Sequence, residues 1–302
     1  MSQRLLVMGD NHGDTESLRR VLDDIADESF DAAVHVGDFT RAMRRDRALG
    51  AEQLRDVEPL LAELDARATH GLLWVYGNQD YFGDLEYDLD VGTEIPDDGT
   101  VTVGGQRFTN SLDHADDDVV LVTHMERWRL ADTFGGRAHF CGNTHLGRRH
   151  GRRLNAAFLQ ATERGEPSKR FGGYFVVDLR GDGFDVEMRP IGDLRRVECD
   201  DHRERGVQFL PADQPCMFCW QDEVLMREMA ASSFYGVTHE GDRETASAAE
   251  LIEYALDLWD DPPMGFSSDF AAYLSAVGED RYAPLARTDD GRLTVAEESY
   301  AY

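Results

Sequence analysis

Short apolar runs recur along the first half of the chain, and each leads into a glycine or a polar residue. They occupy residues 5–8, 32–36, 71–76, 119–123 and 138–141. A short apolar run bounded by turn signals is typical of a buried strand that ends in a tight loop. Between the first two runs, apolar residues recur at helical spacing, so we expect a helix over residues 15–28, capped by Thr15. Because this order is strand, helix, strand, the two strands should be parallel.

The remaining pattern predicts a long helical region, two hairpins and a helical end. Residues 41–69 carry one apolar face, which Pro59 should interrupt or restart. Turns at residues 104–105 and 181–183 separate alternating segments and predict β-hairpins. Strand–helix–strand units followed by hairpins fit two packed sheets with helices outside. Beyond the hairpins, helices are expected over residues 222–231, 245–259 and 266–277.

Side chains that can bind metals follow these apolar runs. They are Asp10, His12, Asp38, Asn78, His124 and His145. Asp10 and His12 alone could be a helix cap beside an exposed histidine, so the recurrence after five runs is what indicates a site. Carboxylate, amide and imidazole ligands together suit Mn, Fe, Zn or Ni better than calcium. Two such ions, roughly 3.5–4 Å apart and bridged by a carboxylate such as Asp38, can hold a phosphate and activate a hydroxide.

Five sequence blocks together resemble a known family. They read Gly-Asp-Asn-His-Gly at residues 9–13, Gly37-Asp38, Gly-Asn-Gln-Asp at residues 77–80, Thr123-His124, and Gly-Asn-Thr-His at residues 142–145. In this order they resemble the calcineurin-like metallophosphoesterases over about residues 4–190. The resemblance implies that residues 1–192 form an α/β domain, a four-layer α/β/β/α sandwich of two mixed sheets with a dinuclear metal centre.

The same resemblance implies a role for each candidate. Asp10, His12, Asp38 and His145 would hold the first metal; Asp38, Asn78 and His124 would hold the second and carry the catalysis. We therefore expect a phosphodiesterase or phosphomonoesterase that uses a metal-activated hydroxide on a small phosphorylated substrate.

Two positions depart from the family's pattern. Asn143 stands where the family has a histidine ligand, so the second metal should be held weakly. Gln79 stands where the family often has a histidine that protonates the leaving group, and an amide cannot donate that proton near pH 7. We expect slow or selective turnover. The alternative is a non-catalytic metal-binding or interaction module of the same fold.

A second cluster combines Cys199, His202, Cys216 and Cys219. Two chelating pairs separated by a loop have the spacing of a structural zinc site. A Cys216–Cys219 disulfide, or two unconnected pairs, are the alternatives. Residues 193–221 would form a small zinc-binding module, and residues 222–302 an acidic, mainly helical region without an assigned function. The fourth cysteine, Cys141, should be a small buried side chain.

The net charge of −28 is extreme, and Lys169 is the only lysine. Such a charge favours a halophilic archaeal protein adapted to a salty cytoplasm, where ions screen the repulsion, over an ordinary acidic protein. It disfavours broad nucleic-acid binding. The arginines at residues 41–47 form either a solvated helix face or a clamp for the substrate phosphate. Together with the arginines of an arginine-rich loop at residues 148–153, they leave a nuclease as a third possible function. No apolar stretch is long enough for a membrane span, so we expect a cytoplasmic protein of undetermined oligomeric state.

Four further histidines are interpreted as structural or exposed. They are His35, His114, His139 and His150.

Overall fold

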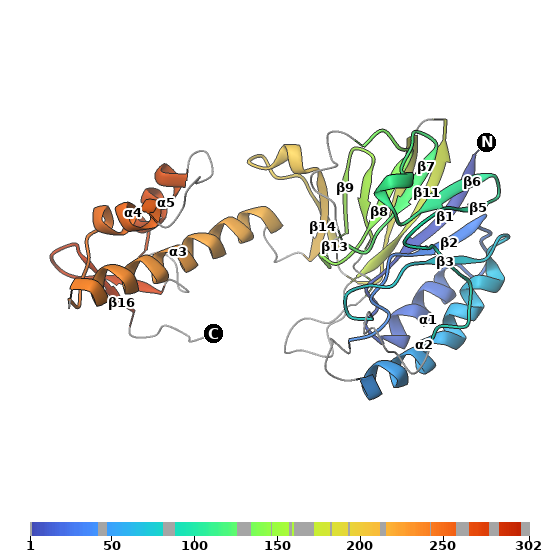
Figure 1. Ribbon diagram of the computed structural model, residues 1–302, viewed down its shortest axis with the longest axis horizontal. Helices are drawn as coiled ribbons and strands as arrows, with labels where there is room; N and C mark the ends of the chain where they lie inside the picture. Colours follow the sequence, from blue (N-terminus) through green and yellow to red (C-terminus); the bar gives the residue numbers. More distant parts are fainter. Residues whose placement is uncertain are drawn as a thin grey trace. The chain divides into compact units, whose positions relative to one another are not determined.

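The structure is a computed structural model (Figure 1). It describes residues 2–41, 47–80, 88–125, 134–145, 147–156, 159, 172–181, 183–192, 194–211, 216–241, 243–257, 266–277 and 284–296. The chain divides into two compact units, Met1–Cys216 and Met217–Tyr302. Arg44 and Arg45, the polar stretch at residues 160–170 and the Pro262-Pro263 pair lie outside the described residues.

The first sheet of the first unit has six strands in the order β12-β11-β1-β2-β3-β4. Its elements are β1 (Gln3–Met8), β2 (Ala32–His35), β3 (Leu72–Trp74), β4 (Thr93–Glu94), β11 (Gly173–Arg180) and β12 (Gly183–Pro190). Strands β1 to β4 run parallel, whereas β11 and β12 form an antiparallel hairpin at one edge. The predicted parallel pairing of β1 and β2, and the hairpin at residues 181–183, are both confirmed.

The second sheet has eight strands in the order β13-β14-β9-β10-β8-β7-β6-β5. They are β5 (Val101–Val103), β6 (Gln106–Thr109), β7 (Val119–Val122), β8 (Ala138–Cys141), β9 (Gly147–His150), β10 (Arg153–Asn155), β13 (Leu194–Val197) and β14 (Val207–Pro211). Strands β6, β7, β8 and β10 are parallel and their neighbours antiparallel. The sheet is therefore mixed, like the first one. Strands β13 and β14, from the stretch expected to be a separate zinc module, pair into it.

Alternation along the strands builds two cores. Leu5 and Val7 of β1 face the second sheet, where Val122 and Phe140 are also buried. Leu6 and Met8 point to the opposite face and pack against helices α1 (Thr15–Asp24) and α2 (Arg47–Arg67). These two helices lie on the side of the first sheet that faces away from the second one (Figure 1). The mixed α/β class with two mixed sheets is confirmed. Among the described residues, helices of this unit cover only the first sheet.

Both helices differ in detail from the sequence prediction. Asp14, not Thr15, caps α1, because its carboxylate accepts the backbone N–H groups of Glu16 and Ser17. The helix ends at Asp24, four residues earlier than expected. Helix α2 continues through Pro59 without a break. The arginine-rich segment at residues 148–153, which was expected to be a loop, lies mostly in β9 and β10.

The second unit packs three helices and a short hairpin around its own core. The helices are α3 (Met217–Gly241), α4 (Ala248–Asp257) and α5 (Phe266–Ser275), and the hairpin is formed by β15 (Leu285–Arg287) and β16 (Leu293–Val295). Phe234, Leu251, Phe270 and Leu293 are buried together. The expected helices are present, although α3 is much longer than predicted, and the hairpin was not expected. No helix in the described part of the chain has the length and apolar character that a membrane crossing requires.

Candidate metal centre

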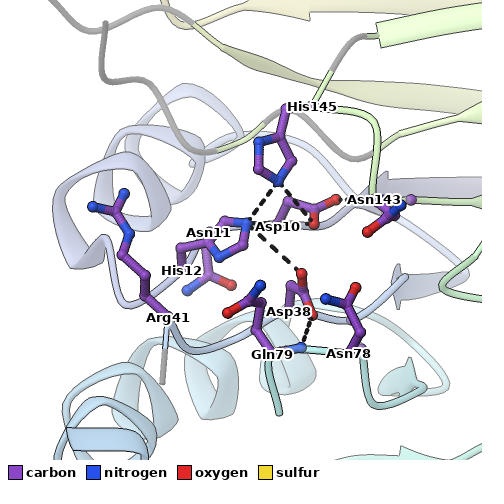
Figure 2. A network of polar contacts seen from close by, with 12 residues as sticks. Asp10, Asn11, His12, Asp38, Arg41, Asn78, Gln79, Asn143 and His145 are labelled. Carbon is purple, nitrogen blue, oxygen red and sulfur yellow. Dashed lines mark hydrogen bonds and ion pairs between the residues drawn. The ribbon is translucent and has the colours of Figure 1, made fainter. Parts of the chain in front are cut away.

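Loops that leave the strand ends bring the six predicted ligands together. Asp10 and His12 follow β1, Asp38 follows β2, and Asn78 follows β3. From the second sheet, His124 follows β7 and His145 follows β8. Figure 2 shows the side chains of Asp10, His12, Asp38 and His145 pointing toward one another. The carboxyl ends of parallel strands share one edge of a sheet, which explains why residues so far apart in sequence meet here.

Four of these residues have the geometry of a metal-binding cluster. One ligand atom each from Asp10, His12, Asp38 and His145 lies within 4.8 Å of the others. Nε2 of His12 is 2.9 Å from Nε2 of His145 and 3.5 Å from Oδ1 of Asp10, and it lies 3.8 Å from Oδ2 of Asp38. Ligands that hold one ion at about 2.1 Å lie roughly 3 Å apart in neighbouring octahedral positions. These separations therefore fit a cation between the side chains.

The hydrogen bonding of these side chains also leaves room for a cation. Oδ1 of Asp10 is buried and has no hydrogen-bond partner, an arrangement that is costly unless an ion satisfies it. Nδ1 of His12 contacts the carbonyl oxygen of Thr40 at 3.1 Å, and Nδ1 of His124 contacts that of Val36 at 2.9 Å. Carbonyls only accept hydrogen bonds, so both Nδ1 atoms are the protonated ones. In the neutral rings, the Nε2 lone pairs then face the cluster, as metal ligation requires.

Asp38 faces both groups of predicted ligands. Its Oδ2 is 3.8 Å from Nε2 of His12 and 3.3 Å from Nε2 of His124. Nε2 of His124 lies 2.8 Å from Oδ1 of Asn78. The second oxygen of Asp38 accepts the backbone N–H of Gln79 at 2.8 Å, which fixes the carboxylate (Figure 2). The Asp38 carboxylate therefore lies between His12 and His124 and within reach of both.

Burial and the neighbouring charges act against each other in this site. Burial alone would raise the pKa of Asp10, but the neighbouring imidazoles of His12, His145 and His124 hold it far below its usual range. Burial lowers the pKa of His124, yet the Asp38 and Asp10 carboxylates and the Val36 carbonyl together outweigh that effect and raise the pKa to about 9. Two buried carboxylates thus create a negative site that attracts protons or cations.

Backbone conformation is unusual at the same residues. The described residues with positive φ that are not glycine are Asp10 (56°), His12 (47°), Asp38 (56°), Asn143 (71°) and His145 (54°). L-residues other than glycine rarely adopt this left-handed conformation, and such strain concentrates at functional sites. Four of the five are the clustered ligands, and Asn143 lies in the same loop as His145. The backbone N–H of Asn143 donates to Oδ2 of Asp10 at 3.1 Å.

The structure also brings together the four residues of the cysteine cluster. Ligand atoms of Cys199, His202, Cys216 and Cys219 lie within 4.8 Å of one another, and none of the cysteines, all of which the structure describes, is in a disulfide. Nδ1 of His202 is 3.6 Å from Sγ of Cys199 and 3.8 Å from Sγ of Cys216. Tetrahedral zinc with Zn–S near 2.3 Å and Zn–N near 2.05 Å places such atoms about 3.6 Å apart. The three thiols and one imidazole therefore form a candidate zinc-binding cluster, neither a disulfide nor two unconnected pairs.

Several buried residues at the centre received no role from the sequence. Asp80 accepts the backbone N–H groups of Phe39, Thr40 and Gly77 at 3.0, 2.8 and 3.0 Å, so it joins the loops after β2 and β3. Burial raises the pKa of Asp80 to about 6. Asn11 and His35 are also fully buried here. Asp80 and Asn11 stand in two of the five sequence blocks, but those blocks gave neither a role. His35 was interpreted only as structural or exposed.

Other predicted groups are engaged elsewhere in the fold. Arg148 and Arg152 donate to the backbone carbonyls of Arg205 and of Gly135 and Gly136, and Arg149 lies over the ring of Phe184. His139 is buried and contacts the hydroxyl of Thr123 at 2.9 Å, as its structural interpretation predicted. Arg41 is exposed in the loop after β2 (Figure 2).

Two packed mixed sheets whose strand-end loops gather aspartates and histidines define an α/β protein with a candidate metal centre. The family model of the calcineurin-like phosphoesterase superfamily domain matches residues 4–175, and the chain belongs to this superfamily. The cysteine cluster lies outside the matched residues.

Solved structures of similar proteins include several phosphoesterases. YfcE, a phosphoesterase from E. coli, is 19% identical over 61% of this chain and 98% of its own, with a TM-score of 0.34. A predicted phosphoesterase from Streptococcus pneumoniae is 16% identical over 63% of this chain and 99% of its own, with a TM-score of 0.32. An archaeal phosphodiesterase is 15% identical over 62% of this chain and 99% of its own, with a TM-score of 0.36. No curated protein matches the chain. Likenesses this low assign no substrate.

Proposed function

We propose that the chain is a metal-dependent phosphohydrolase, a phosphodiesterase or phosphomonoesterase, that acts on a small phosphorylated molecule. The observation that carries this proposal is the cluster of Asp10, His12, Asp38 and His145, with the partnerless buried oxygen of Asp10 at its centre. Superfamily membership supports hydrolysis of phosphate esters as the reaction.

Each side chain has a distinct part in this proposal. Asp10, His12, Asp38 and His145 hold the first divalent metal; Asp38, Asn78 and His124 hold the second. Mn, Fe, Zn or Ni in these positions would supply Lewis acidity and an activated water for attack on phosphorus. Asp38 keeps both positions at a fixed separation, because the N–H of Gln79 anchors its other oxygen.

Asn143 and Gln79 limit what the site can do. An amide at position 143 is a weaker ligand than an imidazole, so the second metal binds less tightly than the first. Gln79 cannot protonate a leaving group near pH 7, so esters with good leaving groups are the preferred substrates. The same two residues favour the second candidate function, a non-catalytic metal-binding module of this fold. A nuclease has less support, because Arg148, Arg149 and Arg152 contact the protein itself.

An assay with added manganese and high salt separates these functions. The wild type should hydrolyse an aryl phosphodiester or monoester, and Asp38→Asn should lower kcat by about 100-fold or more, since it removes the shared carboxylate charge. If the wild type hydrolyses neither ester with any divalent metal, the non-catalytic metal-binding module becomes the favoured function. Cleavage of single-stranded DNA that Asp38→Asn abolishes would instead establish a nuclease. If Asp38→Asn matches the wild type, the site is assigned wrongly.

For the cysteine cluster we infer one structural zinc ion. Gln208 is fully buried and donates to Sγ of Cys216 at 3.1 Å, a contact that stabilises a thiolate. Elemental analysis should find one zinc per chain, and Cys216→Ser should lose it while still binding manganese at the first centre. Cys141→Ser, at the remaining cysteine, should keep the zinc. Zinc retained by Cys216→Ser would exclude this site.

The charge of the chain adds an inference about its surroundings. Fifty-nine acidic residues against 31 basic ones suit a cytoplasm with a high salt concentration, as in a halophilic archaeon.

A further inference from the structure

Asn11 and His35 form a buried pair directly beneath the metal centre. Asn11 lies between the ligands Asp10 and His12, and His35 lies on β2, three residues before Asp38. Both side chains are fully buried. Nε2 of His35 is 2.9 Å from Oδ1 of Asn11, and Nδ2 of Asn11 donates to the carbonyl oxygen of Phe39 at 3.1 Å. The pair thus connects the loop after β1 with the loop after β2.

The hydrogen bonds fix the protonation state of His35. The backbone N–H of Gly37 donates to Nδ1 of His35 at 3.2 Å, so Nδ1 is an acceptor. Nε2 must then carry the proton, and it donates to Asn11. The ring stacks on Phe39 with centroids 4.0 Å apart and planes 15° apart. Burial lowers the pKa of His35 to about 3, so the ring is neutral near pH 7.

The two connected loops carry three of the ligands in a strained conformation. Asp10, His12 and Asp38 all have positive φ. Backbone hydrogen bonds from Asp10 to Gly37 (2.9 Å) and from His12 to Asp38 (3.0 Å) join the same loops along their edges. Side chains add further contacts from the loop after β1: His12 and Asn11 contact the carbonyl oxygens of Thr40 and Phe39. The Asn11–His35 hydrogen bond, below the ligands, supports the Asn11 side chain from β2. Strained loops keep such a conformation only when several contacts determine it together.

We propose that Asn11 and His35 are positioning residues that set the separation of the Asp10 and Asp38 carboxylates, and through it the metal affinity of the centre. This inference rests on the metal centre of the proposed function. It predicts that loss of the buried hydrogen bond weakens metal binding even though neither residue touches a metal.

The test combines manganese titration with electron paramagnetic resonance. Asn11→Leu and His35→Leu should each weaken manganese binding by about 10-fold or more, as loss of residues behind metal ligands does elsewhere. They should also lose the exchange-coupled signal of a manganese pair in favour of isolated ions. His35→Gln can still donate to Oδ1 of Asn11 and should restore most of the affinity and the coupled signal.

A matched control separates positioning from general stability. Leu61→Ala removes a fully buried side chain of α2 that lies in the helix-side core. It should lower the melting temperature and leave manganese affinity and the coupled signal unchanged. In the metal-free protein, ¹⁵N NMR should show His35 as the neutral Nε2–H tautomer at pH 7.

The outcomes also separate this inference from the proposed function. If Asn11→Leu melts earlier but binds manganese like the wild type, the pair is merely structural and the inference is overturned. A protonated or Nδ1–H His35 overturns it as well. If the wild type binds paired manganese, the variants lose it, and no ester is hydrolysed, positioning stands while the hydrolase fails. A wild type that takes up no metal overturns both.

Discussion

The residues of the metal centre are held in conformations that their own side chains disfavour. An L-residue in the left-handed region costs roughly 1–2 kcal/mol, and Asp10, His12, Asp38 and His145 all lie there. The cost is offset by hydrogen bonds between loops, including those that Asp80 accepts from Phe39, Thr40 and Gly77. In return, carboxylates and imidazoles that would otherwise repel or disperse converge on one point.

Glycines allow the loops to approach so closely, and Gly77 gives the sharpest test. A Cβ atom at residue 77 would lie 2.0 Å from Oδ1 of Asp38 and 2.4 Å from its backbone nitrogen. Because the backbone contact cannot be relieved by a rotamer change, Gly77→Ala should displace Asp38. We expect the variant to lose manganese binding and at least about 100-fold in activity, the scale of losing a shared ligand.

Gly183→Ala is the matched control for that variant. A Cβ atom at residue 183 meets nothing within 4 Å, so this substitution should leave metal content and turnover unchanged. Metal titration followed by the ester assay measures both variants. If the folded Gly77→Ala variant binds manganese as tightly as the wild type, manganese binding does not depend on the position of Asp38.

The candidate ligands could be named from the sequence, whereas the residues that support them could not. Asp10, Asp38 and His145 each follow a short apolar run and belong to a glycine-containing sequence block, so their position at the end of a strand could be predicted. Asn11 stands in the first of these blocks and His35 in an apolar run, but neither pattern indicates that the two side chains meet. Their contact joins residues 24 positions apart, and that proximity exists only in the folded chain.

At the scale of elements, long-range partners override local composition. Residues 148–153 were expected to be a loop because arginines dominate, yet most of them belong to β9 and β10. The guanidinium of Arg148 donates to the carbonyl of Arg205, and Arg149 lies over Phe184. Strand pairing with β8 and β14 and these distant contacts decide the structure. The short hairpin of β15 and β16 was not predicted because each of its strands has only three residues, too few to show an alternating pattern.

Helix α4 begins with a reciprocal cap that can be tested by pH. Ser247 and Glu250 exchange hydrogen bonds: the N–H of Ser247 donates to Glu250 at 2.7 Å, and the N–H of Glu250 donates to Oγ of Ser247 at 3.3 Å. The Ser247 backbone N–H and Arg243 lower the pKa of Glu250 from 4.5 to about 2. Its folded form binds fewer protons than its unfolded form between these values. The stabilisation is therefore complete above pH 4.5 and lost as pH falls toward 2.

Glu250→Gln keeps an oxygen that can accept from Ser247 but loses the charge, so it should raise hydrogen-exchange rates in α4 near pH 7. The expected cost is roughly 0.3–1 kcal/mol, the usual contribution of a carboxylate charge at a helix N-terminus. The difference from the wild type should shrink steadily below pH 4.5 and vanish near pH 2. Glu253→Gln, at an exposed position of the same helix, is the control and should change little. A difference that is independent of pH would show that the charge of Glu250 does not stabilise the cap.

On the scale of the whole molecule, 59 acidic residues against 31 basic ones repel one another when the chain is compact. The screening length is about 10 Å at 0.1 M salt and about 3 Å at 1 M, so repulsion between neighbouring surface carboxylates falls steeply over this range. The melting temperature of the full chain should therefore rise as KCl increases from 0.1 to 2 M at constant manganese. A combined Asp27→Asn, Glu52→Gln and Asp56→Asn variant removes three exposed carboxylates. It should melt higher than the wild type at low salt and gain less from KCl. If both proteins show the same salt dependence, or none, repulsion between surface carboxylates does not limit the stability of this fold.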